Sequence, residues 1–582
     1  MPHNIYYEMT MLDDFWRLKI APLLHDPIIK PLVMILGKEK HESVAEDIAK
    51  KIGVANIKIE DTEISWLIAN HHPPHHEREP EKYKRWYKVK EKLSSLKALL
   101  EADHNSSAAD RIPLEDIYIP EILPIHSLSG EKLQSLKIFS IDYSKIKCDI
   151  TKFLSGKLKE YGELKGRFVK NSKLLYLALW RFLPEALMRA LENLPSNIIN
   201  MNLPADTRIP THTIWDHVRT TSALITCIDE GKLKACFLRF ELGGIQDFLS
   251  KARTTADYWA GSWITSALMF SIIKKVSDKI GPDSIIYPDV HGMPLMDLWL
   301  CRGIKIGVDR PNDEDILMPV IPETALIIAP KDKTSSLISE CEDALHKAWQ
   351  TLSCETRKQL KSFFGARIQN WNEFDETWNR QTENIPFTFR ITHTNWPENI
   401  DRAHKRLENV EKSLEKGVSI LTSNVKTFLD KAWKASKRKG EIYVKPALLY
   451  SGLYEELQAK MHASGMIRRF EVTAEPGGAR KRCDLCGLRN PVLDPENDDF
   501  WGLLERERLV DFNERLCSVC FIKRILGGTG SREIKKMSKD VIEKFLEHLC
   551  DEKIRLKKPP AYPSTSDIST AAFKKSLLTL WK

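Results

Sequence analysis

The sequence has no apolar run long enough to cross a membrane. None of its stretches approaches the roughly 18 consecutive apolar residues that a membrane-spanning helix requires. The first residues, Met1 to Asn4, also lack the basic segment followed by an apolar one that marks a secretory signal. We therefore expect a cytoplasmic protein without a membrane partner, whose 11 cysteines are reduced.

Internal repeats and low-complexity tracts are absent as well, which excludes solenoid folds and low-complexity linkers. Hydrophobic residues make up 42% of the 582 residues and charged residues 29%, as in soluble globular proteins. A chain of this length predicts about three to five domains. Its net charge of +8 fits a polyanionic partner such as nucleic acid, and equally an ordinary basic surface.

Histidines gather early in the chain, where 11 of the 17 lie at or before His217. Several of them, and two aspartates, share expected helix faces with apolar residues, where burial without a partner would cost several kcal/mol. Such groups are usually satisfied by a metal ion or a polar network, although each one alone could be an ordinary core or surface residue. The candidates are His25 and Asp26 after Leu23-Leu24, His41 before Ala45 and Ile48, His71 and His72 after a helix over 64–70, Asp103 on the face of Leu93, Leu96 and Leu100, and His217 on the face of Thr221 and Leu224.

Imidazole nitrogens and carboxylate oxygens suit borderline divalent metals such as Mn, Co, Ni, Fe or Zn. If Asp26 bridged two such ions, they would lie about 3.5–4 Å apart and could hydrolyse a phosphodiester without a protein nucleophile.

A second region begins with an expected buried strand over 235–242. Gly243-Gly244 end this strand, and a helix is expected to start at Ile245. Unpaired N–H groups at such a turn can hold a phosphate, although a purely structural turn explains the same glycines.

Four cysteines form two C-x2-C pairs, Cys483 with Cys486 and Cys517 with Cys520, separated by 30 residues. Two such pairs in a reducing compartment indicate one tetrahedral structural Zn, with paired free thiols or a redox site as the alternative. Four thiolates would fill every coordination position of the metal, so we expect its role to be structural.

Taken in order, the His-Asp, His, His-His and Asp candidates resemble the metal ligands of HD-superfamily phosphohydrolases. The first ligand histidine of that superfamily corresponds here to His217, which comes last, and this circular permutation resembles the large subunit of type III CRISPR effector complexes, most like type III-B (Cmr-type). The segments that carry this resemblance are 206–210 and 212–217, 243–248, 252–263, 287–288 and 293–297, the two cysteine pairs with 487–489 and 521–524, and 562–568.

The resemblance implies a multidomain α+β fold. Residues 1–230 would form an all-α, circularly permuted HD nuclease domain, and residues 231–400 a first palm domain with a ferredoxin-like sheet. Residues 401–582 would form a helical region with the four-cysteine zinc module at about 470–530. A charged helix expected over 405–439 would pack on the palm.

The resemblance also implies activities and site residues. The HD domain would cleave single-stranded DNA with a divalent transition metal such as Mn, Ni or Co. Its catalytic ligands would be His25, Asp26, His71, His72, Asp103 and His217, with His41 as a ligand of the second metal. The palm would contact ATP, with Mg²⁺, through Gly243, Gly244, Gly261 and Ser262. Expected partners are the other type III-B subunits and, through the complex, CRISPR RNA and target RNA.

Two departures from the family limit these expectations. Glu241 stands where the family usually has an aspartate, and the glycine-glycine-aspartate-aspartate turn of the family's second, catalytic palm does not occur. We therefore expect no cyclic oligoadenylate synthesis from this chain alone. Either a separate chain supplies the second palm, or the sequence is a truncated one.

Three alternatives stay open. The HD site could be catalytically silent and act as a scaffold for the cyclase half, the protein could be a stand-alone HD nucleotide phosphohydrolase, or it could be a simple nucleic-acid-binding module. Metal content, a substrate panel and salt-dependent binding without cleavage would distinguish them.

Overall fold

The computed structural model describes residues 2–36, 39–108, 142–159, 171–192, 203, 205, 212–368, 371–397, 400–413, 423, 427, 445, 447, 450–467 and 481–560. Segments 206–210 and 562–568, which contribute to the family resemblance, and most of the helix expected over 405–439 lie outside this part of the chain. Among the described residues, no helix combines the length and the apolar character that a membrane crossing needs.

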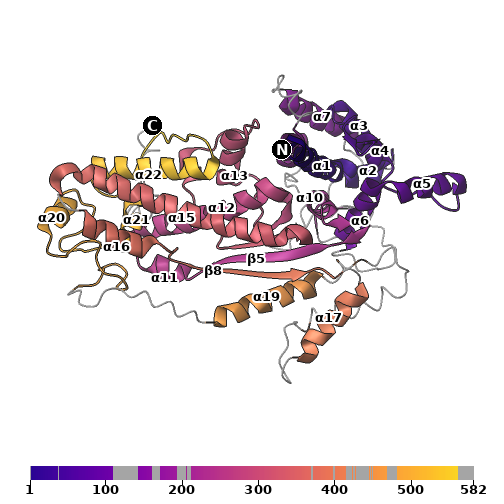
Figure 1. Cartoon of the computed structure of the whole chain (residues 1–582). Helices are drawn as coiled ribbons and strands as arrows, with labels where there is room; N and C mark the ends of the chain where they lie inside the picture. Colours follow the sequence, from indigo (N-terminus) through magenta and orange to yellow (C-terminus); the bar gives the residue numbers. More distant parts are fainter. Residues whose placement is uncertain are drawn as a thin grey trace.

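The first part of the chain is a helical bundle with two small antiparallel hairpins (Figure 1). The threonine that precedes α10 and the aspartate three residues into it form a reciprocal capping box, which fixes where this helix begins. The elements are α1 (Pro2–His25), α2 (Lys30–Leu36), α3 (His41–Lys51), β1 (Lys58–Ile59), β2 (Thr62–Glu63), α4 (Ile64–Ala69), α5 (Pro80–Lys92), α6 (Ser94–Ala108), α7 (Tyr143–Lys159), α9 (Ser172–Leu191), α10 (Ile214–Ile225), β3 (Ile228–Asp229) and β4 (Lys232–Leu233).

A four-stranded antiparallel sheet with the order β6-β7-β5-β8 follows. Helices α12 and α15 cover one of its faces, and α19 lies on the other (Figure 1). The elements of this part are β5 (Ala235–Gly243), α11 (Ile245–Ser250), α12 (Thr255–Ile280), β6 (Ile285–Tyr287), α13 (Pro294–Trp299), α14 (Asp313–Ile316), β7 (Thr324–Pro330), α15 (Thr334–Phe364), α16 (Asn372–Thr382) and β8 (Thr388–Asn395).

The last described part is helical, and it packs against the helices that cover the sheet. Helices α21 and α22 pack against α12 and α15. The elements are α17 (Ile400–Ser413), α19 (Tyr450–Met466), α20 (Asp498–Arg506), α21 (Ser518–Leu526) and α22 (Arg532–Cys550).

The chain is thus a predominantly helical α+β protein, as expected. The strand and the helix expected around Gly243-Gly244 are present as β5 and α11. One local expectation was wrong: Leu93 does not belong to the helix that carries Asp103. The backbone of Leu93 is extended, so α5 ends before it and α6 begins after it.

A buried ion pair joins the helical bundle to the sheet layer. The ammonium of Lys19 in α1 lies 2.9 Å from Asp283 Oδ2 and donates to the carbonyl of Ser222 in α10 at 3.0 Å. Both charged side chains are completely buried. The bundle and the sheet are therefore held together by a specific polar contact as well as by a continuous hydrophobic core.

Candidate metal centre

Five helices bring the predicted ligands of the first region to one place. His25 is the last residue of α1 and Asp26 follows it, while His41 is the first residue of α3. His71 and His72 come directly after α4. Asp103 and His217 lie in α6 and α10, both of which pack against α1.

The ligand atoms form two groups that share Asp26. One group consists of His25, Asp26 and His217, and the other of Asp26, His41, His71 and His72; within each group all ligand atoms lie within 4.8 Å of one another. Asp26 Oδ2 lies 3.3 Å from His217 Nε2, and Asp26 Oδ1 lies 3.4 Å from His41 Nε2. The two oxygens of one carboxylate thus face different histidine groups.

Asp103 completes the first group. Its Oδ1 lies 3.2 Å from His217 Nε2 and 3.8 Å from His25 Nε2. All seven predicted ligands, including His41, are therefore gathered in one centre.

The histidine rings are oriented by hydrogen bonds at Nδ1, the ring nitrogen that points away from the centre. His25 Nδ1 donates to the carbonyl of Pro22, and His71 Nδ1 donates to that of Ile68, each at 2.6 Å. Because a carbonyl only accepts, these bonds place the proton on Nδ1 and leave Nε2 with a lone pair directed at the centre. Ser106 Oγ lies 3.2 Å from Nδ1 of His217.

Several buried polar atoms of the centre have no hydrogen-bond partner among the described residues. They are the Nε2 atoms of His25, His41, His71 and His217, and Oδ1 of Asp26. Leaving one such atom unpaired costs about 1–3 kcal/mol, so five converging ones indicate a missing shared partner. Nitrogen and carboxylate donors fit a borderline divalent cation.

The charges of the centre also favour a cation. Burial lowers the pKa of His41 to about 4, and burial together with His72 lowers that of His71 well below its usual value. These imidazoles are therefore neutral at neutral pH. Burial acts to raise the pKa of Asp26, but Lys30 and the nearby histidines outweigh it and keep this carboxylate ionised.

Two residues of the centre were not foreseen from the sequence. The ammonium of Lys30 lies 2.5 Å from Asp26 Oδ2, and Ser106 holds the ring of His217. Both could have been found by helical spacing, because Lys30 follows Asp26 by four residues and Ser106 follows Asp103 by three.

The residues predicted to contact ATP are spread over a turn and a helix. Gly243 and Gly244 lie at the turn, and Gly244 has φ +83°, a conformation that favours glycine. Gly261 is buried under α11, where a Cβ would come within 2.9 Å of Leu249. Ser262 Oγ donates to the carbonyl of Tyr258. Contact of these four residues with ATP stays a prediction.

The four cysteines of the C-x2-C pairs form a second candidate metal site. Their sulfur atoms lie within 4.8 Å of one another, and all four side chains are buried. Gly487, with φ +68°, closes the first knuckle through its N–H bond to the carbonyl of Cys483, and α21 begins directly after Cys517. The 30-residue separation therefore still brings the two pairs together.

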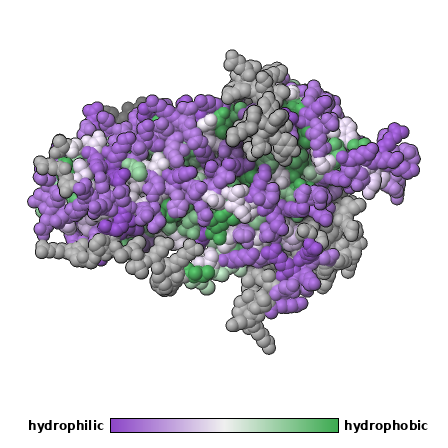
Figure 2. Space-filling view, in the orientation of Figure 1, coloured by the Kyte–Doolittle hydropathy of each residue, from purple (hydrophilic) through white to green (hydrophobic). Residues whose placement is uncertain are grey.

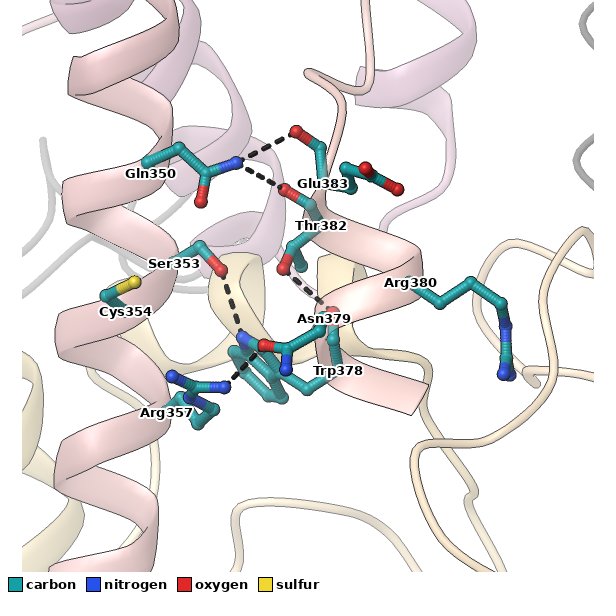
Figure 3. Close-up of a pocket in the computed structure, with 9 residues that line it drawn as sticks. All are labelled: Gln350, Ser353, Cys354, Arg357, Trp378, Asn379, Arg380, Thr382 and Glu383. Carbon is teal, nitrogen blue, oxygen red and sulfur yellow. Dashed lines mark hydrogen bonds between the residues drawn. The ribbon is translucent and has the colours of Figure 1, made fainter. Parts of the chain in front are cut away.

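A hollow of about 350 Å³ lies between α15 and α16 (Figure 3). Its polar groups are bonded to one another: Gln350 donates to the carbonyls of Thr382 and Glu383, and Arg357 donates to Asn379. None of the predicted site residues lines it. It is therefore not the candidate site that the sequence predicts.

Comparisons of the sequence point to one family. The family model described as CRISPR-associated protein Cmr2, N-terminal, matches residues 237–353. The CRISPR system Cmr subunit Cmr2 of Pyrococcus furiosus is 28% identical over 395 residues, which cover 64% of this chain and 41% of that protein. The CMR subunit Cmr2 of Saccharolobus solfataricus is 23% identical over 427 residues, covering 63% and 38%. The chain thus matches less than half the length of these relatives.

Solved structures share the fold. A type III-B Cmr-beta structure in the apo state superposes with a TM-score of 0.58 and 19% identity, covering 97% of this chain and 54% of that one. A Cmr-beta structure bound to cognate target RNA gives a TM-score of 0.51 and 18% identity, covering 96% and 54%. The resemblance of this chain to the large subunit of type III-B, Cmr-type CRISPR effector complexes is therefore confirmed, over a part of that subunit.

Proposed function

We propose that residues 1–230 form an HD-type nuclease domain that cleaves single-stranded DNA with divalent metal ions, in the large subunit of a type III-B effector complex. One observation carries the proposal: the two oxygens of buried Asp26 face two histidine groups, and Nε2 of His25, His41, His71 and His217 has no hydrogen-bond partner among the described residues. Five helices are arranged around these atoms, and a pair of cations accounts for their burial.

The first ion would be held by His25, Asp26, Asp103 and His217, and the second by Asp26, His41, His71 and His72. Such a pair, when bound, activates water and stabilises the charge that develops on a phosphodiester. The chain's own contribution is orientation. The carbonyls of Pro22 and Ile68 fix two imidazole rings, and burial keeps His41 and His71 neutral and able to bind.

Residues 231–400 we assign to a ferredoxin-like palm domain. Its four strands and two longest helices follow one another as β5-α12-β6-β7-α15-β8, and the strand order β6-β7-β5-β8 is the one such a fold requires. Glu241, at the usual aspartate position, is paired with Arg239 and Arg390. The hollow at Gly244 measures only about 50 Å³, whereas ligand pockets usually measure about 300 Å³ or more. ATP would therefore need a further surface, such as a second palm on a separate or longer chain.

Residues 401–582 we assign to a helical region with a structural Zn bound by Cys483, Cys486, Cys517 and Cys520. Four buried thiols leave no position for a substrate. The module is also tied to the palm, because the ammonium of Lys523 donates to the carbonyl of Phe248 in α11.

The partners of the relatives lead to the remaining proposals. Cmr-beta has been solved with cognate target RNA, and we propose that this chain likewise acts with other type III-B subunits, CRISPR RNA and target RNA. The cytoplasm is the proposed location.

A second candidate function is a silent HD scaffold. The observation that favours it is the Lys30 ammonium at 2.5 Å from Asp26, which already supplies one positive charge to the centre. Asp26 Oδ1 nevertheless has no hydrogen-bond partner among the described residues, which favours an active site over a silent one.

The test is cleavage of a labelled single-stranded oligonucleotide in the presence of Mn²⁺, with nucleotides as alternative substrates. The variant Asp26→Asn with His25→Ala should lose cleavage, while the matched variant Asp61→Asn with His75→Ala, at two exposed positions near the centre, should keep it. Full activity in the first variant would overturn the proposal. Hydrolysis of nucleotides alone would favour a stand-alone phosphohydrolase.

A further inference from the structure

Helix α5 is unusually basic and exposed. Its 13 residues include six lysines and arginines but only two glutamates. Only Trp86 is buried in it. The helix projects from the bundle at the right of Figure 1, and the same projection is largely hydrophilic in Figure 2.

The base of α5 is fixed beside the candidate metal centre. Trp86 Nε1 donates at 2.8 Å to the carbonyl of Asn70, the residue before His71. The ring of Tyr83 lies 4.8 Å from that of His76, four residues after His72. The chain then continues into α6, which carries Asp103. The helix thus stands between two segments that supply metal ligands.

Charged and aromatic side chains form neighbouring rows on α5. Lys84, Lys88 and Lys92 are four residues apart and fall on one face. Lys84 is paired with Glu81 at 3.1 Å, while Lys88 and Lys92 have no ion pair with any described residue. In the adjacent row, Tyr83 and Tyr87 stack with their centroids 6.4 Å apart.

The aromatic row is open to ligands. The side chain of Tyr87 is 48% exposed, and Lys90 lies over its ring at 5.7 Å. Tyr87 thus presents an exposed aromatic ring next to Lys88, which has no ion pair with any described residue. Proteins that bind single-stranded nucleic acids combine these two features: aromatic rings on which bases stack, and positive charges that contact the phosphate backbone.

We propose that α5 is a binding surface for single-stranded nucleic acid, which it guides toward the adjacent metal centre. This inference rests on the proposed nuclease function and names where its substrate strand binds. Lys84, Lys88 and Lys92 would contact phosphates, and Tyr87 would stack on a base. A duplex should bind less well, since its paired bases cannot stack on the tyrosine.

The test measures binding of a fluorescent oligothymidylate of about 20 nucleotides, and of the matching RNA and duplex, to the full chain in EDTA, where no metal-dependent cleavage occurs. The variant Lys84→Glu, Lys88→Glu, Lys92→Glu should weaken binding of single strands roughly tenfold or more and should lower the slope of log affinity against log salt by about 2. Tyr87→Ala should weaken binding about fivefold or more without a change in that slope.

The matched control reverses three exposed lysines of α22, with Lys535→Glu, Lys536→Glu and Lys544→Glu. Lys544 has a glutamate partner at 3.0 Å, as Lys84 does at 3.1 Å, so the two triple variants change the same charge. The control should bind like the wild type. Equal loss in both variants, unchanged binding in the α5 variant, or a preference for duplex would overturn the inference.

Cleavage, measured separately with Mn²⁺, keeps the two proposals apart. If the wild type binds through α5 but does not cleave, the nuclease proposal fails and the binding surface stands. If it cleaves and the α5 variant binds and cleaves normally, the binding surface fails and the nuclease proposal stands.

Discussion

The ammonium of Lys30 and the carboxylate of Asp26 form a buried ion pair 2.5 Å long in the middle of the candidate metal centre. The pair uses only Oδ2 of Asp26 and leaves Oδ1 without a hydrogen-bond partner among the described residues. Lys30 therefore offsets part of the negative charge of the centre while the other oxygen stays free for a cation. Both the stability of the metal-free protein and its affinity for metal should depend on this lysine.

Replacement of Lys30 should reveal this dependence. Lys30→Met leaves the buried Asp26 carboxylate without its cation, so the metal-free protein should lose roughly 3–5 kcal/mol of unfolding free energy. Saturating Mn²⁺ should restore most of this loss. Denaturant unfolding with EDTA and with Mn²⁺ measures both quantities.

The control for this experiment is Lys51→Met, since Lys51 pairs with Asp47 at the same spacing but with both side chains well exposed. Its loss should be about 1 kcal/mol or less. Equal losses in the two variants would show that burial of the Lys30–Asp26 pair has no energetic consequence.

The four-cysteine cluster should hold one zinc ion per chain. Cys517→Ser should abolish zinc binding and unfold the segment around α20 and α21, because a small knuckle depends on its metal for folding energy. Zinc content and proteolysis of this region report the two effects. Cys354→Ser, at an exposed cysteine of α15, should change neither. A Cys517→Ser protein with a full complement of zinc would refute the cluster as the binding site.

Arg524 should be essential for docking of α21 on α12, the helix that carries Asp257. Its guanidinium lies 2.7 Å from Asp257 and 2.8 Å from Glu514, and both carboxylates are fully buried. Arg524→Met leaves two buried carboxylates without this cation, and we expect a loss of roughly 3–5 kcal/mol in denaturant unfolding. Arg253→Met, which removes an exposed partner of the same Glu514, should cost about 1 kcal/mol or less. Similar losses would contradict the account.

With ATP and Mg²⁺, this chain alone should form no cyclic oligoadenylate. The sequence contains no glycine-glycine-aspartate-aspartate turn to hold the catalytic Mg²⁺, and the hollow at Gly244 is too small for a nucleotide. Chromatography of the reaction products checks this. Clear product from the isolated chain would show that this chain carries catalytic acids of its own for the reaction.

The gathering of the candidate metal ligands could be predicted from the sequence only because their order resembles that of a known family. Asp26 and His217 are 191 residues apart, and no local pattern brings them within 3.3 Å. The cysteine pairs were different, since their C-x2-C spacing alone indicates one site. Strand β5 was also readable, because it is a short apolar run ended by two glycines.

Other features depend on tertiary contacts and could not be predicted. The break at Leu93 has no proline or glycine to mark it, and it follows from the way α5 is held by Trp86 while α6 enters the bundle. The buried pair of Lys19 with Asp283 joins α1 to the segment directly before β6, and from sequence alone a lysine in a helix is expected at the surface.

Anomalous X-ray diffraction from crystals grown with Mn²⁺ shows whether two cations share Asp26. We expect two anomalous peaks about 3.5–4 Å apart. One should lie against His25, Asp103 and His217, and the other against His41, His71 and His72, with Asp26 between them. A single peak at this centre, or none, would rule out a shared pair of cations.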